Sequence, residues 1–436
     1  MLLRQTLNVF ILMLLLVSTC VSYVRISSAI NKRSYARLKT FRNIGKIQAM
    51  NKNTEQSFWI SPAGLNIEVL YSPATKNPTD SENKAWYLGI YSQIVQLVTQ
   101  QKQSKPKLKP PILFIHGSFH GAWCWAENFF TYFNDLGFDC FAHSLRGTSN
   151  TGLPPGDRVP SIRVESHLKD LLYVIKRIRE EQPERPPPIL IAHSFGGLYL
   201  MKLLEIPENR GNVSAAVFLC SVPPSGLSRM TLRFMQSSFM ESLKIIWGFA
   251  LKAATSDVGL CRRIFFDETV AQEDILRYMK NFLADSRVGL DVINLAPVLP
   301  SVRADPVTGQ ADWLEEISSE RKEEDLDLDL SVTPSLSSEL SSDTENSIDT
   351  EENITEKKNT FIPRLVVGAE KDFIVDAAGT QETATFLGVE PMFLADLPHD
   401  VMLVPRWREA AAVIADWLSS ILSVNLDNNQ ISTTES

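Results

Sequence analysis

The chain has 436 residues, with 44% hydrophobic content, 24 prolines and a net charge of −8. This size and apolar content allow one large α/β domain, or two smaller ones, with a sizeable core. The five cysteines are odd in number, widely spaced and mostly set in apolar stretches such as GFDCFA and AVFLCS. That pattern is typical of buried thiols and argues against a disulfide framework or a zinc site.

The N-terminal segment carries two targeting signals in series. Residues 7–24, LNVFILMLLLVSTCVSYV, form an apolar run after Arg4, which is typical of a secretory signal or a single membrane anchor. Residues 1–54 contain nine Lys or Arg, several serines and no acidic residue, as organelle transit peptides do. The series resembles the bipartite presequence of proteins imported into plastids of secondary origin. An uncleaved anchor, with association to an endomembrane, and ordinary secretion are the alternatives.

A second unusual segment lies near the C-terminal third. Residues 311–360 carry 16 Asp or Glu against 4 Lys or Arg, with almost no aromatic residues. This composition cannot bury enough surface to offset the entropy of ordering, so we expect a disordered insertion. A solvated spacer is a simpler interpretation of it than a regulatory element. The rest of the chain has no basic patch that would indicate a nucleic-acid partner.

Between these segments, strand patterns alternate with helical patterns. Residues 57–72, with Gly64 in the middle, predict an antiparallel hairpin. Helical spacing covers residues 164–181 and 407–422. The alternation is typical of a mostly parallel sheet with helices on both faces. Short apolar runs that predict the other strands are PPILFIHG, FDCFAHS, PPILIAHS, VSAAVFLCS, PRLVVGAE and PMFLADLP.

Strand patterns are absent from residues 228–295, where helical segments predict a cap inserted before the sheet resumes near residue 361. The expected organisation therefore has six parts. They are a presequence or anchor (1–54), a first core part (55–227), a helical cap (228–310), the acidic insertion (311–360), a second core part (361–423) and a polar tail (424–436).

The stretch AHSFGG, residues 192–197, ends a strand pattern at a polar serine followed by two glycines. A serine on a tight strand-to-helix turn is a nucleophile elbow, which needs small residues two before and two after it. Ala192 and Gly196 hold those positions, although Ala stands where Gly is usual. The alternative interpretation is a helix start that Ser194 simply caps.

The partners of a nucleophilic serine must follow it in the order acid, then histidine. Only His399, in LPHDVML after a predicted strand, lies C-terminal to Ser194 among the six histidines. The acid is expected after PRLVVGAE, where Glu370, Asp372 and Asp376 are candidates, and Asp372 best fits a loop just beyond the strand end. No Asp or Glu follows VFLCSVPPSG, the other usual location.

Each part has a chemical task. His399 would take the proton of Ser194, and Asp372 would orient the imidazole and stabilise its charged form. The oxyanion of an acyl-transfer reaction needs two donors, and we expect the backbone N–H groups of Phe195 and Ser118 to supply them.

The motifs HGSFHGAWCW, HSFGG, Asp372-x-x-Val and HDVML together resemble the α/β-hydrolase superfamily, and HGAWCW is similar to the plant methylesterase and hydroxynitrile lyase branch. The chain also resembles plastid α/β-hydrolases of plants and algae that share HGSFHxAWCW and CSVPPSG. The resemblance covers roughly residues 108–310 and 361–422. It implies the α/β-hydrolase fold with a helical cap, the triad and the oxyanion turn, but no particular substrate. The acidic insertion and the presequence have no counterpart in small cytosolic esterases.

His120 and Trp123 are candidates for the substrate pocket, although His120 could equally be a loop residue. We expect His116 to be structural in the oxyanion turn, and His143, His167 and His193 to be packing or surface residues. We expect the Met- and Phe-rich stripe of the cap to pack in the core of the cap rather than to line the substrate pocket. If it lines the pocket, its side chains favour an apolar acyl or alkyl group of the substrate. Its residues are Met230, Phe234, Met235, Phe239 and Met240.

The first interpretation of function is a serine hydrolase that cleaves a small-molecule carboxylic ester or acyl substrate without a cofactor or metal. A noncatalytic small-molecule binder on the same scaffold is the alternative. A hydroxynitrile-type lyase is disfavoured, because the branch that this chain resembles places Lys after the catalytic histidine, where Asp400 would repel cyanide. An epoxide hydrolase or dehalogenase would need Asp in place of Ser194. The sequence does not define the oligomeric state.

Overall fold

The computed structural model describes residues 53–75, 108–154, 161–237, 252–286, 289–290, 295, 298–300 and 362–431. The apolar N-terminal run and the acidic segment 311–360 lie outside the described residues, so the expectations about both stay predictions. Within the described ranges, no helix combines the length and the apolar character needed to cross a membrane.

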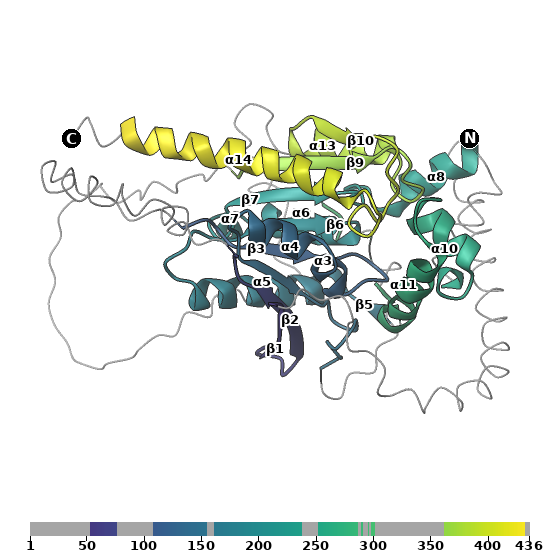
Figure 1. Cartoon of the computed structure of the whole chain (residues 1–436), viewed down its shortest axis with the longest axis horizontal. Coiled ribbons are helices and arrows are strands. Elements are labelled where there is room, and N and C mark those ends of the chain that lie inside the picture. Colours follow the sequence, from purple (N-terminus) through teal and green to yellow (C-terminus); the bar gives the residue numbers. More distant parts are fainter. Residues whose placement is uncertain are drawn as a thin grey trace, which may run out of the picture.

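Eight strands form one sheet in the order β1-β2-β4-β3-β6-β7-β9-β10 (Figure 1). The strands are β1 (Glu55–Ile60), β2 (Asn66–Ser72), β3 (Ile112–Ile115), β4 (Cys140–His143), β6 (Ile189–His193), β7 (Ala215–Leu219), β9 (Arg364–Ala369) and β10 (Pro391–Leu394). β2 is antiparallel to both β1 and β4, and every other pair in the sheet is parallel. The predicted hairpin and the predicted apolar strands are confirmed, with Gly64 at a φ of 74° in the hairpin turn.

Alternate residues of the central strands contact two separate cores, as the period of a strand requires. In β3, Ile112 and Phe114 lie in the core formed with α3 (Trp123–Ala126), α4 (Phe129–Asp135) and α14 (Trp407–Ile431). Leu113 and Ile115 lie in the core formed with α5 (Val164–Glu181), α6 (Phe195–Glu205) and α13 (Ala377–Leu387). The buried strands therefore have helices on both faces, which explains why their sequences are apolar runs rather than alternating patterns.

The helices between β7 and β9 gather at one end of the sheet (Figure 1). Those in the described residues are α8 (Leu227–Ser237), η3 (Ala253–Thr255), α10 (Val258–Phe265) and α11 (Gln272–Asp285). The first member of the predicted stripe, Met230, is buried, and Phe234 packs against the core. The stripe residues Phe239 and Met240 lie outside the described part of the chain.

Three details were not predicted. A two-stranded parallel sheet joins β5 (Ser161–Ile162) to β8 (Gly289–Leu290). A short helix, α7 (Pro207–Arg210), follows α6, and α14 continues to residue 431, into the segment expected to be a polar tail.

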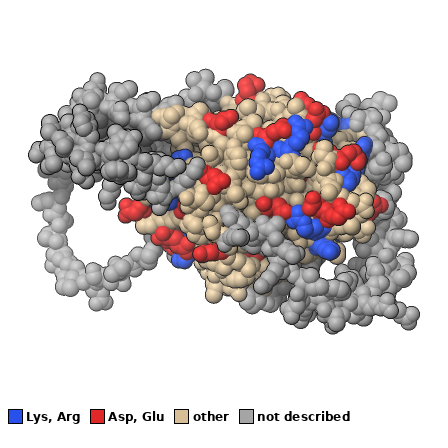
Figure 2. Space-filling view, viewed as in Figure 1, with Lys and Arg blue, Asp and Glu red and all other residues tan. Residues whose placement is uncertain are grey.

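The four cysteines in the described residues are buried and free, as their apolar settings indicated. On the face of the molecule shown in Figure 2, Lys and Arg residues lie beside Asp and Glu residues. Surface ion pairs include Arg406–Glu409 and Arg177–Glu181.

Candidate active site

The chain makes a strained turn at Ser194, between β6 and α6. Ser194 has a φ of 55° and a ψ of −122°, which L-residues rarely adopt. A Cβ added to Gly196 would lie 2.7 Å from Ile115 O and 2.8 Å from His116 O, so only glycine fits this close approach to β3. The Ser194 side chain makes no capping hydrogen bond to α6. The turn therefore has the form of a nucleophile elbow and not of a simple serine cap.

Asp372 and His399 are hydrogen-bonded to each other. His399 Nδ1 donates to Asp372 Oδ2 at 2.7 Å, and both side chains are buried. The other oxygen, Asp372 Oδ1, accepts from the backbone N–H groups of Ile374 at 2.7 Å and Val375 at 2.8 Å. The carboxylate is thereby fixed in place, and in a neutral His399 ring with its proton on Nδ1, Nε2 keeps the lone pair that a general base needs.

The other two candidate acids have different contacts. Asp376 is the N-cap of α13, where its Oδ1 accepts from Gly379 N at 2.9 Å, and it forms a bidentate pair with Arg233 at 2.6 and 2.7 Å. Glu370 is exposed, and its carboxylate accepts from Asp396 N at 3.3 Å. Of the three carboxylates, Asp372 is the one that contacts His399.

His193, the residue before the elbow, holds the backbone of the histidine loop. Its Nε2 donates to His399 O at 3.0 Å, and the centroids of the His193 and His399 rings lie 4.6 Å apart. Burial lowers the pKa of His193 well below its usual range, so the ring is a neutral donor. Sequence reasoning treated His193 as a packing or surface residue, and its place next to the serine was the signal that could have identified this contact.

The turn after β3 lies against the elbow. A Cβ on Gly117 would lie 2.7 Å from Ser194 Cβ and 3.2 Å from Phe195 N. The N–H of Ser118 donates to none of the described residues, and Phe195 is the first residue of α6, so its N–H has no acceptor within the helix. The two amides expected to bind an oxyanion therefore lie on adjoining turns, without acceptors among the residues that the structure describes.

His116 holds this turn through two hydrogen bonds to the backbone. Its Nδ1 donates to Gly117 O at 2.7 Å, and its Nε2 accepts from Leu145 N at 2.9 Å. Burial keeps the pKa of His116 well below its usual range, which fits a ring with one donor and one acceptor nitrogen. These contacts support the structural role expected for His116.

The two pocket candidates are buried and hydrogen-bonded within the protein. His120 Nε2 contacts Asp400 Oδ2 at 2.9 Å, and His120 Nδ1 contacts Ser118 O at 2.8 Å. Trp123 Nε1 donates to Asp285 Oδ2 on α11 at 2.7 Å, and the indole ring stacks on His120 at 5.9 Å. Contact of either side chain with a substrate stays a prediction.

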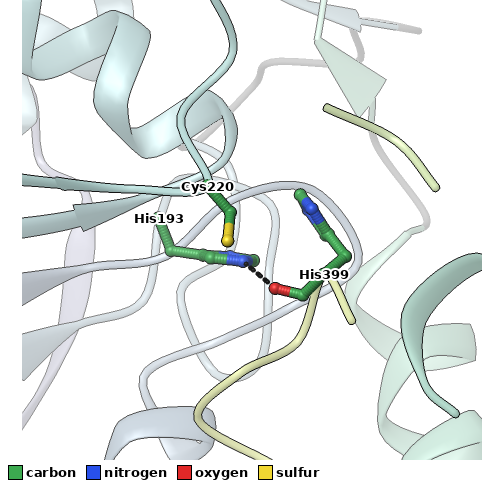
Figure 3. A group of neighbouring side chains, drawn as sticks. All are labelled: His193, Cys220 and His399. Atoms are coloured by element: carbon green, nitrogen blue, oxygen red, sulfur yellow. Dashed lines mark hydrogen bonds between the residues drawn. The ribbon is translucent and has the colours of Figure 1, made fainter. Parts of the chain in front are cut away.

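Three buried side chains near the elbow could bind a metal ion. The ligand atoms of His193, Cys220 and His399 lie within 4.8 Å of one another, and Figure 3 shows the Cys220 thiol beside the two imidazole rings. However, His193 Nε2 and His399 Nδ1 already donate hydrogen bonds. Burial and the nearby Asp372 raise the pKa of the Cys220 thiol well above its usual range, which disfavours the thiolate that a metal requires. The group therefore fits a hydrogen-bonded acid–base site better than a metal centre.

Sequence reasoning missed the position of Cys220. This residue has a φ of 46° and follows β7, the strand end where a catalytic acid was sought and not found. The end of this strand was predicted from the sequence. The residue that follows it could therefore have been expected to lie near the catalytic histidine.

The mostly parallel sheet, the elbow after β6, and the acid and histidine on loops after β9 and β10 are the features that define an α/β-hydrolase. The chain matches the Alpha/beta hydrolase family over residues 112–411 and belongs to that family.

Two curated relatives are methylesterases of Arabidopsis thaliana. Methylesterase 2 is 26% identical over 140 residues, which is 32% of this chain and 49% of the relative. Methylesterase 1 is 29% identical over 124 residues, which is 28% of this chain and 43% of the relative. The matches thus span about half the length of these relatives or less. Among solved structures, an esterase from Exiguobacterium antarcticum is 12% identical with a TM-score of 0.49, covering 84% of this chain and 100% of that chain.

Proposed function

We propose that the protein is a serine hydrolase that cleaves a carboxylic ester through Ser194, His399 and Asp372. The observation that carries the proposal is the 2.7 Å contact between His399 Nδ1 and Asp372 Oδ2 on the loops beside the strained Ser194 turn. In a Ser-His-acid site, the acid holds the imidazole in the tautomer that can accept the serine proton.

In the first half of the reaction, Ser194 Oγ attacks the ester carbonyl carbon while His399 Nε2 takes the hydroxyl proton. The carbonyl oxygen becomes an oxyanion, which the N–H groups of Ser118 and Phe195 would stabilise. The C–O bond to the alcohol then breaks, and His399 returns the proton to the leaving alkoxide. The products of this half are an alcohol and an acyl group on Ser194.

The second half repeats the steps of the first half in reverse order, with water as the nucleophile in place of the alcohol. His399 takes a proton from the water, the hydroxide attacks the acyl carbon, and the same two amides would stabilise the second oxyanion. The bond to Ser194 Oγ breaks, and the serine recovers its proton from His399. The acid is released, and the enzyme returns to its starting state.

Aromatic side chains around the histidine support an apolar substrate group. Phe265 of α10 lies 6.4 Å from the His399 ring and 5.5 Å from Phe119 in the oxyanion turn, and Phe282 of α11 packs on both Phe265 and Phe119. An apolar acyl or alkyl group of the substrate would suit such surroundings. The names of the two Arabidopsis relatives point to methyl esters as the first substrates to examine.

The proposal is tested by comparing purified wild-type protein with Ser194→Ala on a panel of methyl and p-nitrophenyl esters of increasing acyl length. We expect turnover by the variant to fall at least about 10⁴-fold, because the nucleophile is lost, while its melting temperature stays close to that of wild type. Ester turnover by Ser194→Ala close to that of wild type would exclude the serine mechanism. The matched control is Ser144→Ala, which alters a buried hydroxyl bonded to Glu68 outside the triad.

A further inference from the structure

His120 and Asp400 form a buried contact between two loops of the candidate site. Their side chains are 280 positions apart in the chain, and His120 Nε2 lies 2.9 Å from Asp400 Oδ2. The two residues are 1% and 0% exposed. Asp400 directly follows His399, and His120 belongs to the same turn as Ser118. The contact therefore joins the histidine loop to the oxyanion turn.

Both nitrogens of the His120 ring face an acceptor. Nε2 faces the Asp400 carboxylate, and Nδ1 faces Ser118 O at 2.8 Å. A neutral imidazole has one N–H and one lone pair, so it can donate to only one of these oxygens. Two good hydrogen bonds require a proton on each nitrogen, which makes the ring an imidazolium.

The surroundings of Asp400 also require a cation. Asp400 Oδ1 is buried and has no hydrogen-bond partner among the described residues, so His120 is the side chain that compensates the carboxylate. An uncompensated buried carboxylate is strongly destabilising. Although burial alone would lower the pKa of His120, the charge and the hydrogen bond of Asp400 outweigh it and raise that pKa.

The turn that His120 holds is itself strained. Phe119, between Ser118 and His120, has a φ of 69°. A bulky residue in this conformation persists only where its surroundings hold it. The hydrogen bond from His120 Nδ1 to Ser118 O spans this residue, and thus orients the peptide groups next to the Ser118 amide.

We propose that His120 and Asp400 form an imidazolium–carboxylate pair that holds the oxyanion turn in its working geometry, and that loss of the shared proton as the pH rises loosens the turn and lowers turnover. His120 and Asp400 act through Ser118 and are positioning residues. This inference rests on the proposed serine hydrolase function.

The consequence follows from the acceptor geometry. Once the proton is lost, one ring nitrogen presents a lone pair either to Ser118 O or to the Asp400 carboxylate, and that contact becomes repulsive. Because the pKa of His120 is raised by folding, the stabilising contact is complete at lower pH and is lost as the pH rises through that pKa.

Four titratable groups around the pair stay uncharged on the alkaline side. Burial keeps the pKa values of His116 and His193 well below the usual range and raises the pKa values of the Cys124 and Cys261 thiols. Asp285, which acts on His120 from α11, has a pKa raised by burial to about 6 and so titrates on the acid side.

The test measures kcat and KM separately from pH 6 to 10, with p-nitrophenyl butyrate as the probe. For wild type, we expect kcat to fall at alkaline pH. Asp400→Asn should remove that fall and keep kcat near pH 7 within about threefold of wild type, because the introduced amide can donate to Nε2 of a neutral ring. Asp400→Ala should lower kcat about 10- to 100-fold at every pH with KM nearly unchanged, as a misplaced oxyanion donor would.

The matched control is Asp170→Asn, which breaks the ion pair between Asp170 of α5 and Arg146 in the loop after β4. This variant should lose stability and keep the wild-type pH profile. A wild-type kcat that stays flat to pH 10, or an Asp400→Asn profile with the wild-type alkaline fall, would overturn the positioning role. Failure of the hydrolase proposal is distinguished from this outcome by Ser194→Ala, which would then remain active.

Discussion

The loops at the carboxyl ends of the sheet strands differ in backbone conformation from the segments that precede the amino ends. Within the described parts of the loops after the carboxyl ends, five non-glycine residues have positive φ angles, namely Phe119, Ser149, Ser194, Cys220 and Asp396. The amino ends use residues that suit ordinary turns. Pro111, Pro188 and Pro363 directly precede β3, β6 and β9, and Gly137, with a φ of 86°, precedes β4.

Strained non-glycine conformations cost free energy and persist where the surroundings over-determine them. At the carboxyl ends, the surroundings include buried polar side chains that form hydrogen bonds with side chains or with the backbone, namely His116, His120, Asp372, His399 and Asp400. The comparison teaches that the side chains at the carboxyl ends of the strands hold the backbone around Ser194 in a defined geometry. Substitutions there should change rates more than stability, and substitutions away from it should do the reverse.

The largest expected effect separates two carboxylates that lie four positions apart. Asp372→Asn should lower kcat about 10⁴-fold, because the amide can favour the wrong tautomer of His399 while the fold is kept. Asp376→Asn should keep kcat within about tenfold of wild type, since that carboxylate caps α13 and binds Arg233. Turnover of both purified variants on one active ester measures the difference. If Asp376→Asn were inactive and Asp372→Asn active, the assignment of the acid would be wrong.

A smaller effect on rate is expected at the oxyanion turn. Gly117→Ala would place a Cβ 2.7 Å from Ser194 Cβ and 3.2 Å from Phe195 N, so the two turns must move apart. We expect kcat to fall about 100-fold or more, as for the loss of one oxyanion donor, with a smaller change in KM. Gly211→Ala is the control, because nothing lies within 4 Å of its added Cβ. Equal activity of the two variants would show that the two turns need not be so close.

The smallest effect is on stability alone. Asp376→Ala removes the N-cap of α13, and such a loss costs about 1 kcal/mol in the free energy of unfolding. Urea denaturation of wild type and variant measures this change, and the turnover of the folded variant should stay within about tenfold. A large loss of turnover without a loss of stability would assign Asp376 to the candidate active site. It would also contradict the expected separation between substitutions that change rate and substitutions that change stability.

The elements and the central residues could be predicted because their signals are local. Five of the six apolar runs form strands that are buried on both faces of the sheet, whereas the edge strand β10 leaves Met392 and Phe393 exposed. Gly196 after Ser194 is needed because an added Cβ would lie 2.7 Å from the backbone oxygen of Ile115 in β3. The order of Ser194, Asp372 and His399 follows from the order of the strands that carry them.

Contacts between distant segments could not be predicted in the same way. The pair of His120 and Asp400 depends on how two loops 280 positions apart meet, and no pattern in either loop indicates its partner. The same holds for Glu68, a buried carboxylate in β2 that accepts from Ser144 at 2.6 Å and Asn150 at 2.6 Å. The two-residue strands β5 and β8 are too short for any periodicity to appear.

The central claim is that Ser194 is the nucleophile, and the most direct measurement is the site of covalent modification by a fluorophosphonate. Such probes phosphonylate an activated serine, with loss of fluoride, and the adduct can be located by mass spectrometry of proteolytic peptides. We predict one adduct on the peptide containing Ser194, which does not form in Ser194→Ala and forms far more slowly in Asp372→Asn. Folded wild-type protein that remains unmodified at Ser194, or is modified at another serine while ester turnover is lost, would contradict the account.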